Sequence, residues 1–148
     1  MNWDTLLKSE LELVYHATQG LIDFLDEDQL DWKPAMENNW MTHGQLLMHI
    51  TSSCGFCFRG FVTGDWGLPE GKEMQDLSPE EMLPPAEKMP TVHSIREAKD
   101  LLEKDRQLAL EMLGQTKNEE LDSKILAAPW APDMQRPLGQ HLLQMIGH

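Results

Sequence analysis

Apolar residues recur at helical spacing in four separate segments of this chain, and no segment alternates as a strand would. The segments are 3–25, 42–61, 94–114 and 137–148. In the first, Leu7, Leu11 and Val14 fall on one helical face. A chain of 148 residues can bury one core without disulfides. We therefore expect a single all-α domain spanning residues 1–148.

Capping residues mark where these helices begin. Thr42 precedes Gln45 by three positions, and Ser94 precedes Glu97 by the same spacing. In such a capping box the hydroxyl accepts from a backbone N–H of the first turn while the Gln or Glu side chain reaches back. Gly114 is a natural stop for the third helix.

The connections predict the order of the helices in space. The first is short, which favours antiparallel neighbours. The next, 65–90, holds five prolines, and we expect one helical turn in it, capped by Ser78. Such a long crossover lets the second and third helices run parallel, which gives an up-down-down-up four-helix bundle. The fourth helix has at most about 12 residues before His148, from which we expect a truncated form of a longer bundle.

Charge excludes two classes of partner. The formal net charge is −13, and protonating all six histidines would still leave the chain negative. Nucleic acid and anionic membrane surfaces both require a cationic partner, so we expect neither. No apolar run approaches the roughly 18–20 residues that cross a bilayer, and the N-terminus lacks the pattern of a secretion signal. These features predict a cytoplasmic protein.

Two histidines on apolar helical faces are candidate metal ligands. His49 lies on the second helix and His148 on the fourth, and ligands from different helices are how bundles build metal sites. His141 lies two turns before His148, about 10.5 Å along the same helix, which is too far to share an ion. The alternative is that the histidines only pack in the core.

Cys54 and Cys57 form a C-x-x-C pattern inside a helical segment. Redox-active C-x-x-C pairs follow a strand, which is missing here, so two half-buried thiols are the simpler interpretation. A redox role, or a role for Cys57 near a metal, stays open. Asp105 interrupts the buried face of the third helix, and either holds a histidine or pairs with Arg106.

Several stretches of the chain resemble the DinB/YfiT-like superfamily, bacterial four-helix proteins that hold a divalent metal on three histidines. The resemblance rests on Trp32-Lys33-Pro34, on residues 39–49 ending in His49, on residues 60–66, on Pro129-Trp130 and on residues 142–148. It implies that His49 is the first ligand and His148 the second. The third ligand would lie four residues beyond His148, where this sequence has no residue, so the implied zinc or nickel ion should be held weakly.

The resemblance also implies a function. It implies a homodimer. Related members include thiol-dependent S-transferases, so we expect a metal-dependent transferase or hydrolase-like activity with a low-molecular-weight thiol as the partner. The sequence identifies neither a substrate nor a catalytic residue. The alternative is a non-catalytic helical scaffold.

Overall fold

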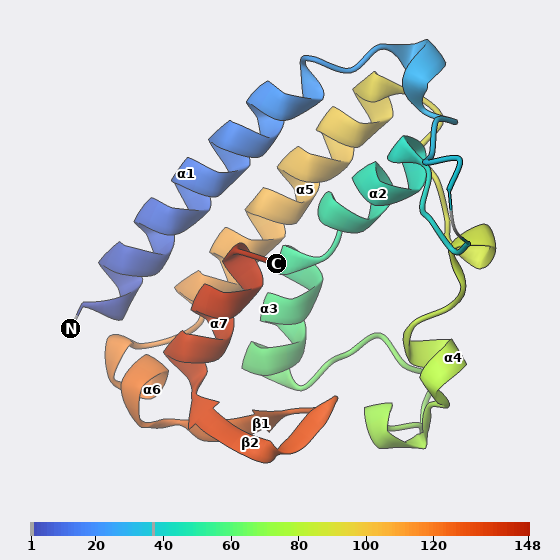
Figure 1. Cartoon of the computed structure of the whole chain (residues 1–148). Coiled ribbons are helices and arrows are strands. Elements are labelled where there is room, and N and C mark those ends of the chain that lie inside the picture. Colours follow the sequence, from blue (N-terminus) through green and yellow to red (C-terminus); the bar gives the residue numbers. More distant parts are fainter. Residues whose placement is uncertain (1, 37) are drawn as a thin grey trace.

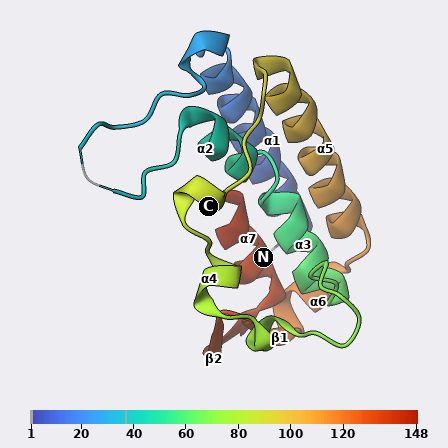
Figure 2. The ribbon, with the colours of Figure 1, turned by 90° about the vertical axis from the view of Figure 1, so that its right-hand side faces the viewer.

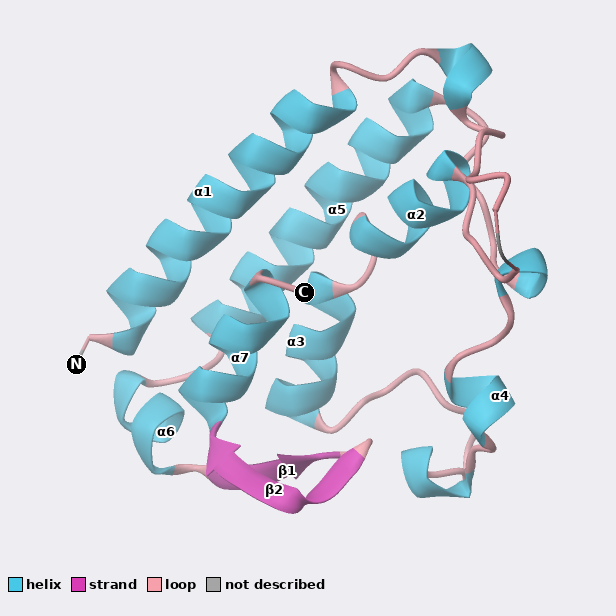
Figure 3. Ribbon diagram, in the orientation of Figure 1, coloured by secondary structure: helices cyan, strands magenta, loops and turns pink. Residues whose placement is uncertain are grey.

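The computed structural model describes residues 2–36 and 38–148, and most of the chain is helical (Figures 1 and 3). The main helices are α1 (Trp3–Ile22), α2 (His43–Ile50), α3 (Cys54–Thr63), α5 (Ile95–Gly114) and α7 (Leu138–Ile146). Figure 1 shows α1 and α7 running in one direction and α2, α3 and α5 in the other. The helical prediction is confirmed, with α2 and α3 together taking the place of the second helix.

The second predicted helix is broken at residues 51–53, so the prediction of one continuous helix over 42–61 was wrong. The Thr51 hydroxyl donates to the Leu47 carbonyl at 2.7 Å, and the Ser52 hydroxyl donates to the Met48 carbonyl at 2.5 Å. The Ser53 hydroxyl likewise donates to the His49 carbonyl. Hydroxyls that bond back to the preceding turn bend helices, and three in succession separate α2 from α3.

A small β-hairpin precedes the last helix, so the prediction that the chain has no strand was also wrong. Strand β1 (Ile125–Ala128) pairs antiparallel with β2 (Ala131–Pro137). Between the two strands, the Trp130 ring packs edge-on against two other rings. The ring centroids lie 5.8 Å apart for Phe61 of α3 and 5.7 Å apart for Trp66. The hairpin therefore closes one end of the bundle and sets the start of α7.

The crossover between α3 and α5 is fastened to the start of α2. It contains α4 (Pro79–Met82), which Ser78 caps as predicted, and Figure 2 shows it running outside the helices. The Gln45 side chain completes the predicted capping box with Thr42. Its amide also donates to the carbonyls of Ala86 at 2.5 Å and Met89 at 3.1 Å. One side chain thus begins α2 and holds the crossover against it.

The core lies where α1, α3, α5, α6 (Asn118–Ser123) and α7 meet. Its fully buried side chains include Leu7, Leu11, Phe58, Leu113, Leu121 and Leu142. Within residues 2–36 and 38–148, no helix is long and apolar enough to cross a membrane.

Candidate metal centre

The rings of His49 and His148 meet at the end of α7. Their centroids are 5.6 Å apart and their planes are inclined at 73°, an edge-to-face contact. His49 lies in the last turn of α2, and His148 follows α7 by two residues. The structure therefore brings together the two imidazoles that the sequence placed on separate helices.

His49 sits where the helix breaks. Its Nδ1 atom lies 3.5 Å from the Ser53 hydroxyl, at the outer limit of hydrogen bonding. Burial lowers the pKa of His49, and the neighbouring charge of His148 lowers it further. The neutral imidazole, which is the form that binds metal ions, is therefore favoured at neutral pH.

His141 is part of the core rather than of this site. It is buried, its Nε2 donates to the Leu126 carbonyl at 2.8 Å, and its ring stacks on Phe61 at 4.6 Å. One face of the ring is thus committed to α3, and its Nε2 is committed to β1. That His141 and His148 do not share an ion stays a prediction.

A cavity of about 360 Å³ opens beside the histidine pair. Its apolar wall is formed by Val14, Ile50, Leu102, Met145 and Ile146. Its polar lining consists of Tyr15, Thr18, His49, Ser53, Cys54 and His148. Side chains from α1, α2, α3, α5 and the end of α7 therefore converge on one space.

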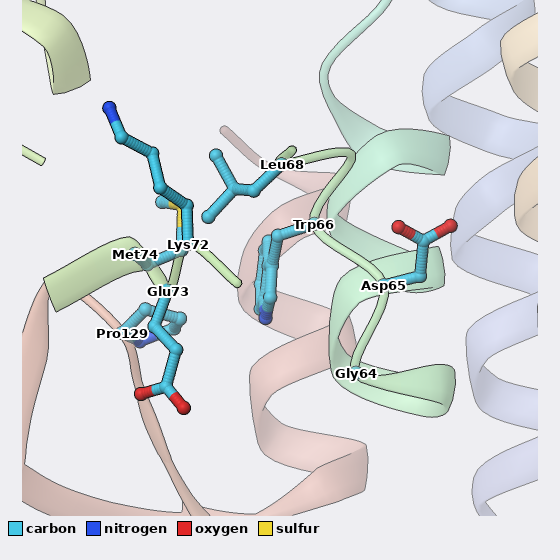
Figure 4. Close-up of a pocket in the computed structure, with 8 residues that line it drawn as sticks. All are labelled: Gly64, Asp65, Trp66, Leu68, Lys72, Glu73, Met74 and Pro129. Atoms are coloured by element: carbon cyan, nitrogen blue, oxygen red, sulfur yellow. The ribbon is translucent and has the colours of Figure 1, made fainter. Parts of the chain in front are cut away.

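A second cavity, of about 370 Å³, lies beside the hairpin (Figure 4). Trp66 and Pro129 line it together with the charged side chains Asp65, Lys72 and Glu73. Of the residues that the structure describes, neither a histidine nor a cysteine lines it. It is therefore chemically unlike the pocket at His49 and His148.

Comparison with known proteins assigns the chain to a family. The sequence pattern of the DinB superfamily matches residues 10–148, a range that includes both His49 and His148. The chain belongs to the DinB superfamily. Among curated proteins, none matches this sequence. Membership accounts for the order of the main helices. The hairpin and the break after α2 in this DinB chain were not predicted from the sequence and are seen in the structure.

The part of this DinB chain that the structure describes holds no group of three or more His, Cys, Asp or Glu side chains that could bind a metal ion together. Cys54 lines the histidine pocket, but burial raises the pKa of its thiol to about 12. Burial also raises the pKa of Cys57 to about 11. Thiols are weak ligands and weak nucleophiles until they ionise, so neither a redox role nor a ligand role is favoured for them.

Asp105 of α5 anchors the start of α3, which neither sequence interpretation of this residue anticipated. Its Oδ1 accepts from the Gly55 N–H at 3.0 Å, and its Oδ2 accepts from the Tyr15 hydroxyl at 2.6 Å. Arg106 instead pairs with Glu103 and Glu12. The carboxylate thus acts as a cap for α3 supplied by another helix.

Sequence reasoning missed Tyr15. It follows Leu11 by one helical turn on the buried face of α1, and it is only 6% exposed. A phenol at such a position requires a partner for its hydroxyl. A search for a buried carboxylate would have pointed to Asp105, and the Cys54 thiol is a further hydrogen-bond partner of Tyr15.

Proposed function

We propose that this DinB-superfamily protein binds a divalent metal ion, zinc or nickel, through His49 and His148. The observation that supports the proposal is the edge-to-face meeting of two imidazoles from separate helices at 5.6 Å. Imidazole suits both metals. Two protein ligands are fewer than the three or four of most zinc sites, so the expected affinity is low and several coordination positions remain for small molecules.

A divalent metal bound there would lower the pKa of a thiol or a water molecule that it binds, which is the chemistry of a thiol-dependent S-transferase or a hydrolase. The chain's own residues would shape the rest of the reaction site. His49 and His148 would hold the ion, and Ser53 beside the His49 Nδ1 would orient that ring. The apolar wall formed by Ile50, Met145 and their neighbours would exclude bulk water.

Metal titration of single variants tests the proposal. We expect the purified chain to bind one equivalent of Zn²⁺ or Ni²⁺ by calorimetry, and His49→Gln and His148→Gln each to weaken binding roughly 10–100-fold. His16→Gln is the matched control, because His16 is exposed on α1 away from the pair. Equal binding by all four proteins would mean that the metal sits elsewhere, and the proposal would fail.

A second role, as an interaction protein, is favoured by an apolar stripe on α1 and just after it. Leu13 is 63% exposed, Leu21 is 67% exposed and Phe24 is 85% exposed. We propose that a second copy of the chain covers this stripe and forms a homodimer. Light scattering at tens of micromolar should give the mass of two chains, and Leu21→Lys should give one; a wild-type monomer under the same conditions would contradict the dimer.

A further inference from the structure

Among the residues that the structure describes, the two histidines are the only ionic side chains in the wall of the pocket beside them. Within residues 2–36 and 38–148, lysine, arginine, aspartate and glutamate are all missing from its lining. The pocket near the hairpin, of similar volume, has three such residues in Asp65, Lys72 and Glu73. The difference therefore lies in the chemistry of the two cavities and not in their size.

Two of the three hydroxyl groups in this wall, those of Tyr15 and Ser53, are already used as donors. The Tyr15 hydroxyl donates to Asp105 at 2.6 Å, and the Ser53 hydroxyl donates to the His49 carbonyl. An anionic group inside the pocket would meet no lysine or arginine, within a chain of formal charge −13. Burying such a charge without a partner is costly.

A cationic group would be no better placed. Among the described residues the buried carboxylate is that of Asp105, and its two oxygens accept from Gly55 and Tyr15. Five aliphatic or thioether side chains dominate the remaining surface, from Val14 on α1 to Ile146 on α7. Such a wall favours an uncharged, apolar body.

From this lining we infer that the pocket takes a neutral and largely apolar small molecule, with one polar head directed at His49 and His148. A cavity of about 360 Å³ accommodates on the order of ten non-hydrogen atoms, if each needs about the 30 Å³ of a water molecule. The inference deepens the proposed function by naming the class of its substrate. It rests on that function only for what the head contacts, because the apolar body is bound by the wall itself.

Binding to the metal-free protein tests the inference without relying on a metal. Benzyl alcohol, benzoate and benzylamine share one ring and differ in charge. The probe signal is the ¹³C-labelled methyl group of Met145, which lines the pocket and is assigned with Met145→Leu. We expect benzyl alcohol to shift this signal saturably, and benzoate and benzylamine to bind at least tenfold more weakly. Equal or tighter binding of either charged compound, or no binding of the alcohol, would overturn the inference.

Filling the pocket provides a matched control. Val14→Trp places an indole in the wall, whereas Glu111→Trp adds the same group at an exposed position of α5. Only the first should abolish the shift. If Val14→Trp does not fold by circular dichroism, Thr18→Phe serves the same purpose on the same wall. Unchanged binding in a folded pocket-filling variant would refute the site.

The two proposals fail separately. Alcohol binding without stoichiometric metal would refute the metal site and leave the apolar pocket standing. If His49→Gln loses metal binding and the metal-free protein prefers benzoate, the metal site is supported and the inference of a neutral, apolar ligand is refuted.

Discussion

Two polar clusters use their atoms in opposite ways: one is centred on Asp105 of α5, and the other is the histidine pair that lines the pocket. Asp105 spends both carboxylate oxygens inside the protein, on the Gly55 N–H and the Tyr15 hydroxyl. The His49 and His148 rings touch edge to face, and His148 is exposed to solvent. A group whose bonds are all internal stabilises the fold, whereas a group that faces a cavity is available to a ligand. The comparison assigns a structural role to Asp105 and supports the proposal that the histidines bind a ligand.

The largest effect is expected from Asp105→Ala. It leaves the Tyr15 hydroxyl and the α3 amide without their acceptor in a buried place, which should reduce the free energy of unfolding by about 2–4 kcal/mol in urea denaturation. Asp100→Ala on the exposed side of α5 is the control, and its effect should stay within about 0.5 kcal/mol. Equal effects of the two variants would break the comparison.

The closeness of α3 to α5 predicts the next effect. A Cβ at Gly55 would lie 2.6 Å from the backbone oxygen of Asp105, so Gly55→Ala should cost about 1–3 kcal/mol by urea denaturation. Gly114→Ala on α5 meets open space and should be neutral or slightly stabilising. A Gly55→Ala protein as stable as Gly114→Ala would show that the two helices separate easily.

The pH dependence of stability should carry the signature of Asp105. Burial raises its pKa above 3.8, although the hydrogen bonds from Tyr15 and from the amides of α3 oppose the change. The native state therefore keeps this proton to higher pH, and the stability from the protonated form, complete below pH 3.8, is lost as pH rises through the native pKa. The facing groups Cys54 and Cys57 titrate far above this range.

Asp105→Asn cannot ionise and isolates this contribution. The stability of the wild type minus that of Asp105→Asn should fall by about 1 kcal/mol or more for each unit by which the native pKa exceeds 3.8. Urea unfolding of both proteins between pH 4 and 7 measures it. A difference that rises with pH would mean that the native carboxylate is stabilised as an anion.

The smallest effect on stability should come from the histidine pair. His49→Gln and His148→Gln remove groups that are half-buried and exposed, so each should change the free energy of unfolding by no more than about 0.5 kcal/mol at pH 8. Chemical denaturation of the variants already made for metal titration gives this value. A loss as large as that of Asp105→Ala would assign the histidines to the fold.

Local sequence patterns were enough to predict most of the helices and the proximity of His49 to His148. The spacing of apolar residues predicts α1 and α5, and Thr42 and Ser94 cap α2 and α5 as expected. The Thr42–Gln45 capping box is complete, whereas the Glu97 side chain accepts from the His93 N–H instead of that of Ser94. The family resemblance pointed to the same histidines, and membership in the DinB superfamily is confirmed.

What could not be predicted depends on partners far away in the sequence. The cap on α3 comes from Asp105, 50 positions from Gly55, and no local pattern contains it. β1 is only four residues long, and β2 ends in a proline. Neither strand shows the alternation of apolar and polar residues that identifies strands in a sequence. The break after α2 follows from hydroxyl side chains that a count of apolar residues does not register.

The interruption at residues 51–53 separates the helix that carries His49 from the helix that is held against α5. α3 is tied to α5 through Gly55, and the start of α2 is tied to the crossover through Gln45. The direction of the His49 side chain therefore depends on the three hydroxyl residues between α2 and α3, and not on the axis of one continuous helix. Exchanging those residues should change the direction of one imidazole while Asp105 still holds the start of α3, and so should alter which ligand the proposed pocket accepts.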